Sequence, residues 1–185
     1  MKKLRLIIFI TLALVAVLSP CTSADYVSDQ KGTLRGIEAL LIVIGKLPPA
    51  VKELGLTKEQ LRTEVAATVR LSGITVVPLE AFPTLDPYLY ITINTAYKQP
   101  YLSYALRSEL KQLVYLGRDK DTSCDAATWT RQKAGITEKA HAKSEIMKNI
   151  RHLVESFISD YVAANHSEAD TPQGGISTMK VFLTL

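Results

Sequence analysis

The sequence has very little cysteine, which limits the disulfides and thiolate metal sites that its fold can use. Cys21 and Cys124 are the two cysteines among 185 residues. Cys21 lies in a leader that we expect to be removed, so the mature chain keeps Cys124 alone. A single cysteine cannot form an intrachain disulfide, and the fold must therefore be stabilised by an apolar core.

The chain also lacks an apolar run long enough to cross a bilayer. A cationic start, Met1 to Arg5, precedes an uncharged apolar run from Leu6 to Leu18. This run is shorter than the about 20 residues of a membrane-spanning helix. The pattern is that of a secretory signal peptide, so we predict a signal peptide at 1–24, cleavage after Ala24, and a periplasmic or secreted protein without a transmembrane anchor.

An alternative processing route involves the first cysteine. The segment from Leu18 to Cys21 resembles a bacterial lipobox, in which the cysteine is lipidated and becomes the new N-terminus. Pro20 departs from that pattern, because a small residue normally precedes the cysteine. Lipidation of Cys21 would tether the protein to a membrane as an accessory subunit of an envelope complex.

The mature chain has little net charge. The full sequence carries +4 and a pI of about 9.0, but the charge falls to +1 when Lys2, Lys3 and Arg5 leave with the signal peptide. Nucleic-acid binding depends on neutralising phosphates with a basic surface. We therefore predict no nucleic-acid partner.

Hydrophobic periodicity predicts one α+β domain at 34–165, between a flexible segment at 25–33 and a linker and tail at 166–185. We expect a mostly antiparallel sheet of about five strands in the order β-α-β-β-β-β-α, with both helices packed on the sheet. Thr57 and Gln60 form a capping-box pattern at the start of the first helix, and Gly73 is placed to end it. The expected strands are 34–47, 74–77, 88–95, 102–116 and 126–134, and the last helix is 138–164.

Aromatic residues are concentrated in the expected strand pair. Tyr88 and Tyr90 alternate with Leu89 and Ile91, which places the tyrosines on the opposite face of the strand. One interpretation is that they form cross-strand pairs that stabilise the sheet. The other is a surface for a small ligand or an envelope protein, formed by Tyr88, Tyr90, Tyr101 and Trp129.

No motif for catalysis or for a cofactor is evident. The sequence has no Gly-x-Ser-x-Gly elbow, phosphate loop or Gly-x-Gly-x-x-Gly. Cys124 is a candidate nucleophile, but Asp125 beside it would raise the pKa of a thiol; Glu109 is a candidate carboxylate. We keep a hydrolase-like enzyme as an alternative function.

The histidines do not predict a metal site. They are His141, His152 and His166. The first two share one side of the last helix, but 11 residues separate them by about 16 Å along its axis. Glu145 could join only His141, so we predict no metal and no cofactor.

The C-terminal residues 176–185 (ISTMKVFLTL) are apolar but too short to span a bilayer. They are either a frayed terminus or a strand that adds to a sheet edge.

Six segments of the sequence share a pattern with known proteins, namely GIEALLIVIGKL, LGLTKEQLRTEVAATVRLSGITVV, PYLYITINT, YALRSELKQLVYLGRD, AATWTRQKAGI and IRHLVESFISDYVAAN. They resemble an uncharacterised group of small exported bacterial proteins. The resemblance implies a periplasmic α+β domain and brings no reaction, cofactor or catalytic residue. We therefore expect a non-enzymatic binding or assembly module of the bacterial cell envelope.

Overall fold

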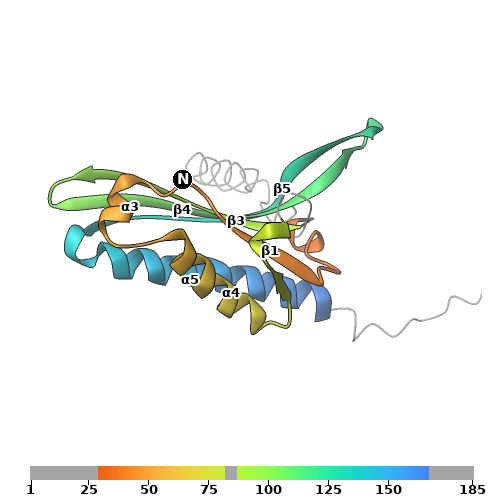
Figure 1. The fold of residues 1–185 in the computed structure, drawn as a ribbon. Coiled ribbons are helices and arrows are strands. Elements are labelled where there is room, and N and C mark those ends of the chain that lie inside the picture. Colours follow the sequence, from red (N-terminus) through yellow and green to blue (C-terminus); the bar gives the residue numbers. More distant parts are fainter. Residues whose placement is uncertain (1–28, 82–86, 167–185) are drawn as a thin grey trace, which may run out of the picture.

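A five-stranded sheet with helices on one face forms the body of the protein in the computed structural model, which describes residues 29–81 and 87–166 (Figure 1). The spatial order of the strands is β2-β1-β3-β4-β5. The predicted α+β class is confirmed. Along the chain the elements are β1 (Ala39–Ile44), α3 (Pro49–Glu53), α4 (Lys58–Arg70), β2 (Thr75–Val77), η1 (Leu79–Ala81), β3 (Tyr88–Lys98), β4 (Tyr101–Leu116), β5 (Asp119–Glu138) and α5 (Lys139–His166).

The sheet is mixed because β1 is parallel to both of its neighbours. It pairs with β2 on one side and β3 on the other, whereas β3, β4 and β5 follow one another as antiparallel strands. Parallel neighbours need a crossover connection, and α4 supplies it between β1 and β2. The long antiparallel part therefore holds most of the sheet's area.

The first long helix, α4, begins and ends where its sequence predicts. Thr57 Oγ1 accepts the backbone N–H of Gln60 at 3.1 Å, and the Gln60 side chain accepts the N–H of Thr57 at 3.3 Å. Gly73 follows the helix with φ +85°, a conformation that favours glycine. The predicted capping box and terminating glycine are confirmed.

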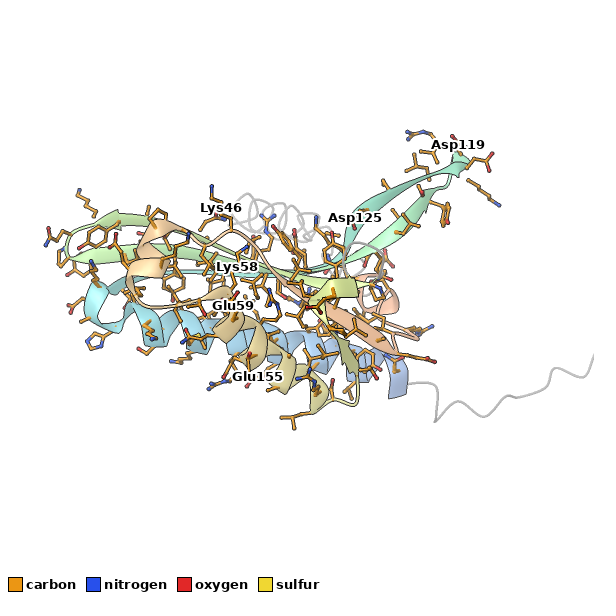
Figure 2. The ribbon with its side chains drawn as sticks, in the orientation of Figure 1. Lys46, Lys58, Glu59, Asp119, Asp125 and Glu155 are labelled. Carbon is orange, nitrogen blue, oxygen red and sulfur yellow. The ribbon has the colours of Figure 1, made fainter. Side chains whose placement is uncertain are left out.

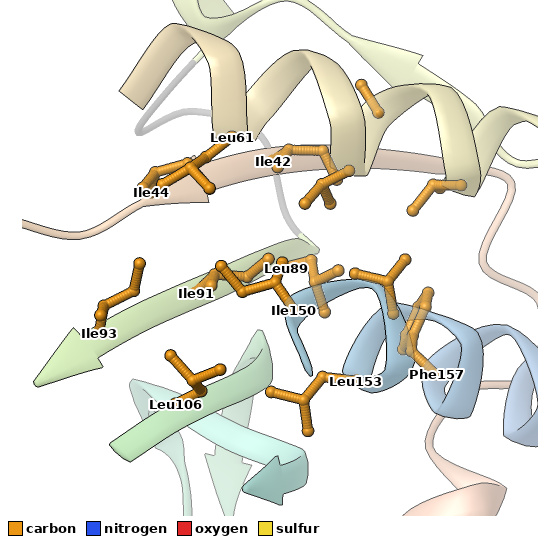
Figure 3. Packing of buried hydrophobic residues seen from close by; sticks show 14 of the residues in the cluster. Ile42, Ile44, Leu61, Leu89, Ile91, Ile93, Leu106, Ile150, Leu153 and Phe157 are labelled. Atoms are coloured by element: carbon orange, nitrogen blue, oxygen red, sulfur yellow. The ribbon is translucent and has the colours of Figure 1, made fainter. Parts of the chain in front are cut away.

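The apolar core lies between the sheet and the two long helices. In Figure 3, Ile91 and Ile93 of β3 face the same interior as Ile150 and Phe157 of α5. These side chains are at most 2% exposed. The alternation along the strands and the helical spacing of α5 together explain this packing, since each puts its apolar residues on one face.

The N-terminal part of the body differs from our expectation. Residues 29–32 are helical and 33–36 form a turn, so the strand that we predicted at 34–47 is only 39–44. Leu34 is fully buried, and the Asn165 amide of α5 donates to its carbonyl at 3.1 Å. Gln30 is 5% exposed. The folded body therefore begins before Leu34, because α5 and the core hold this segment in place.

The strand β5 is much longer than the predicted 126–134. Beyond Lys111, the described part of β4 pairs only with β5, and the register joins Gln112 to Ala126 at the root of this ribbon. We call residues 112–126 the arm; Figure 1 shows it projecting from the body. Residues Asp119 to Asp125 are polar because both faces of the arm meet solvent. Without an alternation of apolar residues, the sequence there did not predict a strand.

Candidate functional site

No helix of the described residues covers the sheet face turned away from α4 and α5, and its side chains on β3, β4 and β5 are exposed or half-buried. On β4, Leu106 and Leu110 are buried toward the helices, whereas Ala105 and Arg107 are exposed on the other side. On β5, Ile136 is 72% exposed on that same side. We define the open face by the residues that share it through strand alternation and register: Tyr88, Tyr90, Thr92, Asn94, Tyr101, Ser103, Ala105, Arg107, Glu109, Lys111, Thr130, Gln132, Ala134 and Ile136.

Tyr88 and Tyr90 are half-buried on the open face. Their rings meet edge to face, with centroids 6.4 Å apart and planes at 82°. The Tyr88 hydroxyl donates to Asp125 Oδ2 at 2.5 Å, and Lys111 Nζ lies 5.3 Å from the Tyr90 ring centroid. The pair is therefore held in place by contacts with Asp125 and Lys111, and both rings stay partly exposed.

Gly45 lets Tyr90 lie close to the end of β1. A Cβ atom at Gly45 would come within 3.1 Å of Tyr90 Oη and 3.3 Å of the Ile91 carbonyl oxygen. Such contacts are too tight for an unshifted side chain. An alanine here would require its neighbours to give way by a few tenths of an ångström.

The middle of the open face is polar and hollowed. Two shallow hollows of about 360 and 510 Å³ share Arg107 and Gln132, which are opposite each other in the β4–β5 register. Asn94 lines one hollow and Glu109 the other, and Arg107 donates to Glu109 at 3.3 Å. Guanidinium and amide groups there can hydrogen-bond a partner's carbonyl or carboxylate.

Tyr101 lies on the open face but far from the tyrosine pair. Tyr101 pairs with Lys98 at the start of β4, whereas Tyr88 pairs with Lys111 at the other end of the same ladder. Ten residues of strand correspond to about 33 Å. Tyr101, which is 50% exposed, therefore contributes to a separate end of the surface.

Trp129 does not belong to this surface, which corrects our sequence-based assignment. The side chain is fully buried on the helix-facing side of β5 and packs edge to face on Phe157, with centroids 5.2 Å apart. Its indole Nε1–H donates to Asp160 Oδ2 at 3.0 Å. A β-bulge near Lys111 and the burial of Asp160 were not visible in the sequence pattern.

Asp160 is the centre of a partly buried charge cluster beneath β5. Arg131 donates to Oδ2 at 2.5 Å and Lys31 Nζ lies 3.0 Å from Oδ1. Burial raises the pKa of Asp160, but hydrogen bonds from Trp129 and Lys31 and the charges of Arg131 and Lys31 outweigh burial, so the net pKa is lowered. The cluster joins the N-terminal segment, β5 and α5, which indicates a structural role.

A second polar contact in the core joins β4 to α5. The Asn149 amide donates to Tyr104 Oη at 2.8 Å and to the Glu145 carbonyl at 2.8 Å. Burial, followed by the nearby charge of Glu145, raises the pKa of the Tyr104 hydroxyl. The Tyr104 ring covers Gly135, where a Cβ atom would lie 2.5 Å from the hydroxyl oxygen.

The arm continues the open face with apolar side chains. Tyr115 is 63% exposed and Leu113 is 49% exposed. Both alternate in phase with Lys111 and Glu109, so they extend the same face beyond Tyr88. The expected strand at 102–116 includes Leu113 and Tyr115, but sequence reasoning began the last strand at 126 and so gave this extension no partner strand.

The residues considered for catalysis are not assembled into a site. Cys124 is exposed on the arm opposite Val114, and no described residue hydrogen-bonds its sulfur. Glu109 pairs with Arg107 on the open face. Of the histidines, His141 and His152 are exposed on α5. Within residues 29–81 and 87–166, no three His, Cys, Asp or Glu side chains are grouped to hold a metal ion.

Membrane-related predictions fall mostly outside the structure. Cys21, the leader at 1–24 and the tail at 176–185 lie outside the described residues. Within the described part of the chain, no helix combines the length and the apolar character that crossing a bilayer requires.

Comparison with known proteins gives distant structural likenesses only. No protein-family model matches the chain, and no curated protein matches it in sequence. A PelC dodecamer subunit from Paraburkholderia phytofirmans is similar at 12% identity and TM-score 0.38, covering 69% of this chain and 89% of that one. The lipoprotein GNA1162 of Neisseria meningitidis is similar at 13% identity and TM-score 0.34, covering 66% and 98%. A minor lipoprotein of Acinetobacter baumannii has 6% identity and TM-score 0.26, covering 72% and 93%. At these identities and TM-scores, the likeness transfers no function to this chain.

Proposed function

We propose that this chain is a non-enzymatic binding or assembly module of the bacterial cell envelope, and that its partner docks on the open face. The observation that carries the proposal is a sheet face across β3, β4 and β5 that no described helix covers, with Tyr88 and Tyr90 at one end and Arg107 and Gln132 in the middle. Protein interfaces combine aromatic side chains with hydrogen-bonding groups, and tyrosine and arginine are enriched in them.

The arm enlarges this surface. Tyr115 and Leu113 present exposed apolar area in phase with Tyr88. Large exposed apolar side chains that cluster on one face mark interaction sites. A partner that covers both the open face and the arm would remove these side chains from water.

Photo-crosslinking in the producing cell tests the docking surface. A photoreactive amino acid at Ala105 samples the middle of the open face, and the same group at Ala163 samples an exposed position of α5. We expect Ala105 to crosslink to a specific envelope component and Ala163 not to do so. Equal crosslinking patterns at the two positions, or no adduct at Ala105, would contradict the proposal.

The envelope location is tested separately at the N-terminus. The leader pattern predicts that the isolated protein begins at Asp25, whereas lipidation predicts a modified Cys21 as the first residue. Mass spectrometry of the native protein distinguishes these outcomes. A chain that starts at Met1 and stays in the cytosolic fraction would contradict the proposed location in the cell envelope.

A further inference from the structure

The outer edge of β5 in the arm can receive another strand. Residues 119–127 have β4 on one side, and no described strand lies on their other side. Their ladder with β4 is regular from Ser123 to Ala127 and shifted near the tip. Figure 2 labels Asp125 near the body and Asp119 at the far end of this edge. In an antiparallel ladder, every second residue turns its backbone N–H and C=O away from the paired strand, so these groups are available to a new neighbour.

The arm would gain stability from such a neighbour. Isolated two-stranded hairpins are marginally stable in water, and a third strand or a covering helix is needed for independent stability. Residues 119–125 are all exposed, and Tyr115 of the facing strand is 63% exposed. Within the described part of the chain, neither a helix nor a third strand supports this ribbon.

The sequence that follows α5 contains a segment with the pattern of a strand. Residues 176–185 (ISTMKVFLTL) lie outside the described residues and are rich in the β-branched and aromatic types that favour strands. Every second residue from Met179 to Leu185 is apolar, whereas Thr178, Lys180 and Thr184 lie on the other side of an extended chain. Such alternation is typical of a strand with one covered face.

The end of α5 lies close to the root of the arm. The Asn165 side chain donates to the Leu34 carbonyl at 3.1 Å, which joins the end of α5 to the N-terminal segment. The carbonyl of the adjacent Thr33 accepts the Gln112 side chain at 3.0 Å, and Gln112 also donates to Thr128 Oγ1 at 2.7 Å. Gln112 and Thr128 belong to the two strands at the base of the arm. The chain therefore leaves α5 beside this ribbon.

The course of α5 gives the direction in which the following chain meets β5. Because β5 ends at Glu138 and α5 begins at Lys139, the helix runs back along the strand, and Asp160 contacts Trp129 on the way. A chain that continues in this direction runs antiparallel to β5 from Ala127 toward the tip. The connection at 167–175 has nine residues, which can span about 30 Å, so its length permits this path.

We propose that residues 176–185 form a third, antiparallel strand on the β5 edge of the arm of the same chain. Residues 176–180 pair with 123–127, and the remaining five residues continue toward the tip. In this register Met179 lies opposite Cys124. The pairing goes beyond the proposed docking function, since it uses backbone groups at the edge and widens the open face without covering it.

Cys124 is a native probe for this pairing, because it is exposed on the edge in question. The full chain carries Cys21→Ser, and single cysteines are introduced in turn from Ser177 to Leu183 and oxidised with diamide. We expect Met179→Cys to form an intrachain disulfide with Cys124 about tenfold faster than its two neighbours, since successive strand residues point to opposite faces. Equal rates along the segment, or disulfides that join two copies instead, would overturn the proposal.

Hydrogen exchange on a shortened chain tests the pairing without a new cysteine. A chain that ends at Gly175 keeps α5 and the connection but lacks the proposed strand. We expect the amides of 119–127 to exchange about tenfold faster than in the full chain, although in both chains they exchange before those of β3. The amides of 132–138, on the body edge of the same strand, are the matched control and should not change. Unchanged exchange at 119–127, or a change at 132–138 instead, would overturn the proposal. Trp129 fluorescence verifies that the shortened chain is folded.

Discussion

Replacing Asp160 with asparagine should destabilise the protein because it removes the charge that three groups share. Trp129 donates to this carboxylate at 3.0 Å, and Arg131 and Lys31 pair with it. Removing one partner from a buried ion pair costs about 3 to 5 kcal/mol. The Arg131 and Lys31 side chains are 26% and 40% exposed, so water partly compensates them. We expect Asp160→Asn to lower the free energy of unfolding by about 2 to 3 kcal/mol at pH 7.

The effect of this substitution should depend on pH in one direction. The pKa of Asp160 is lowered by folding, so its stabilising contribution is present above the unfolded pKa of about 3.9 and is lost as pH falls through the lower folded pKa. The gap in unfolding free energy between the native protein and Asp160→Asn should therefore be constant from pH 7 to about 5 and narrow below about 4.

Urea unfolding followed by fluorescence measures this gap directly, since Trp129 is the single tryptophan of the sequence and contacts Asp160. The control is Glu155→Gln on the same helix, whose side chain is 57% exposed and lies 4.0 Å from His152. It should change stability by less than about 0.5 kcal/mol. A loss below about 1 kcal/mol in Asp160→Asn, or a gap that widens toward acid, would refute the reasoning.

Substitutions at three further positions test separate features of the fold by the same unfolding assay. Gly135→Ala should cost about 1 to 3 kcal/mol because its Cβ would lie 2.5 Å from Tyr104 Oη, and a cost near zero would show that the ring moves freely. Thr57→Ala should cost about 1 kcal/mol through loss of the cap on Gln60, whereas Thr57→Ser should restore most of it. Leu71→Ser should change stability by less than about 0.5 kcal/mol, since Leu71 is 89% exposed; a larger loss would mean that the residue is covered in solution.

The sequence predicts those parts of the fold that local chemistry determines. The Thr57 capping box, Gly73 and the alternation of Leu89, Ile91 and Ile93 all specify structure through neighbours a few residues away. The expected strand ends at 95 and 102 lie close to the observed ones for the same reason, as β3 ends at Lys98 and β4 begins at Tyr101.

The errors occur where distant residues decide the structure. Leu34 reads as part of an apolar strand, but Asn165 and the core hold its segment outside the sheet. Tryptophan is common at binding surfaces, but Trp129 lies in the core, where its indole N–H donates to Asp160 of α5. The helix α3 is short and has a proline at its start, so the sequence offers little periodicity to detect it.

The candidate surface is predictable only in part for the same reason. Strand alternation places Tyr88 and Tyr90 on one face, but it does not reveal whether a helix covers that face. Nor does alternation show that Tyr101 lies far from this pair, or that Tyr115 extends the face on which the pair lies. Those relationships depend on the register of β4 against β3 and β5, which the sequence does not show.

The arm has only two described strands, which makes local unfolding easier there than in the body. Each strand there has one described neighbouring strand, so only alternate backbone amides find a partner in the ladder, and the ribbon projects from the layer that the helices support (Figure 1). Isolated two-stranded hairpins are marginally stable in water. The arm can therefore fray and re-form while the body remains intact, so its amides should exchange with deuterium before those of β3. If a partner binds the arm as proposed, the tip can change its backbone conformation to fit that partner while the body keeps its structure.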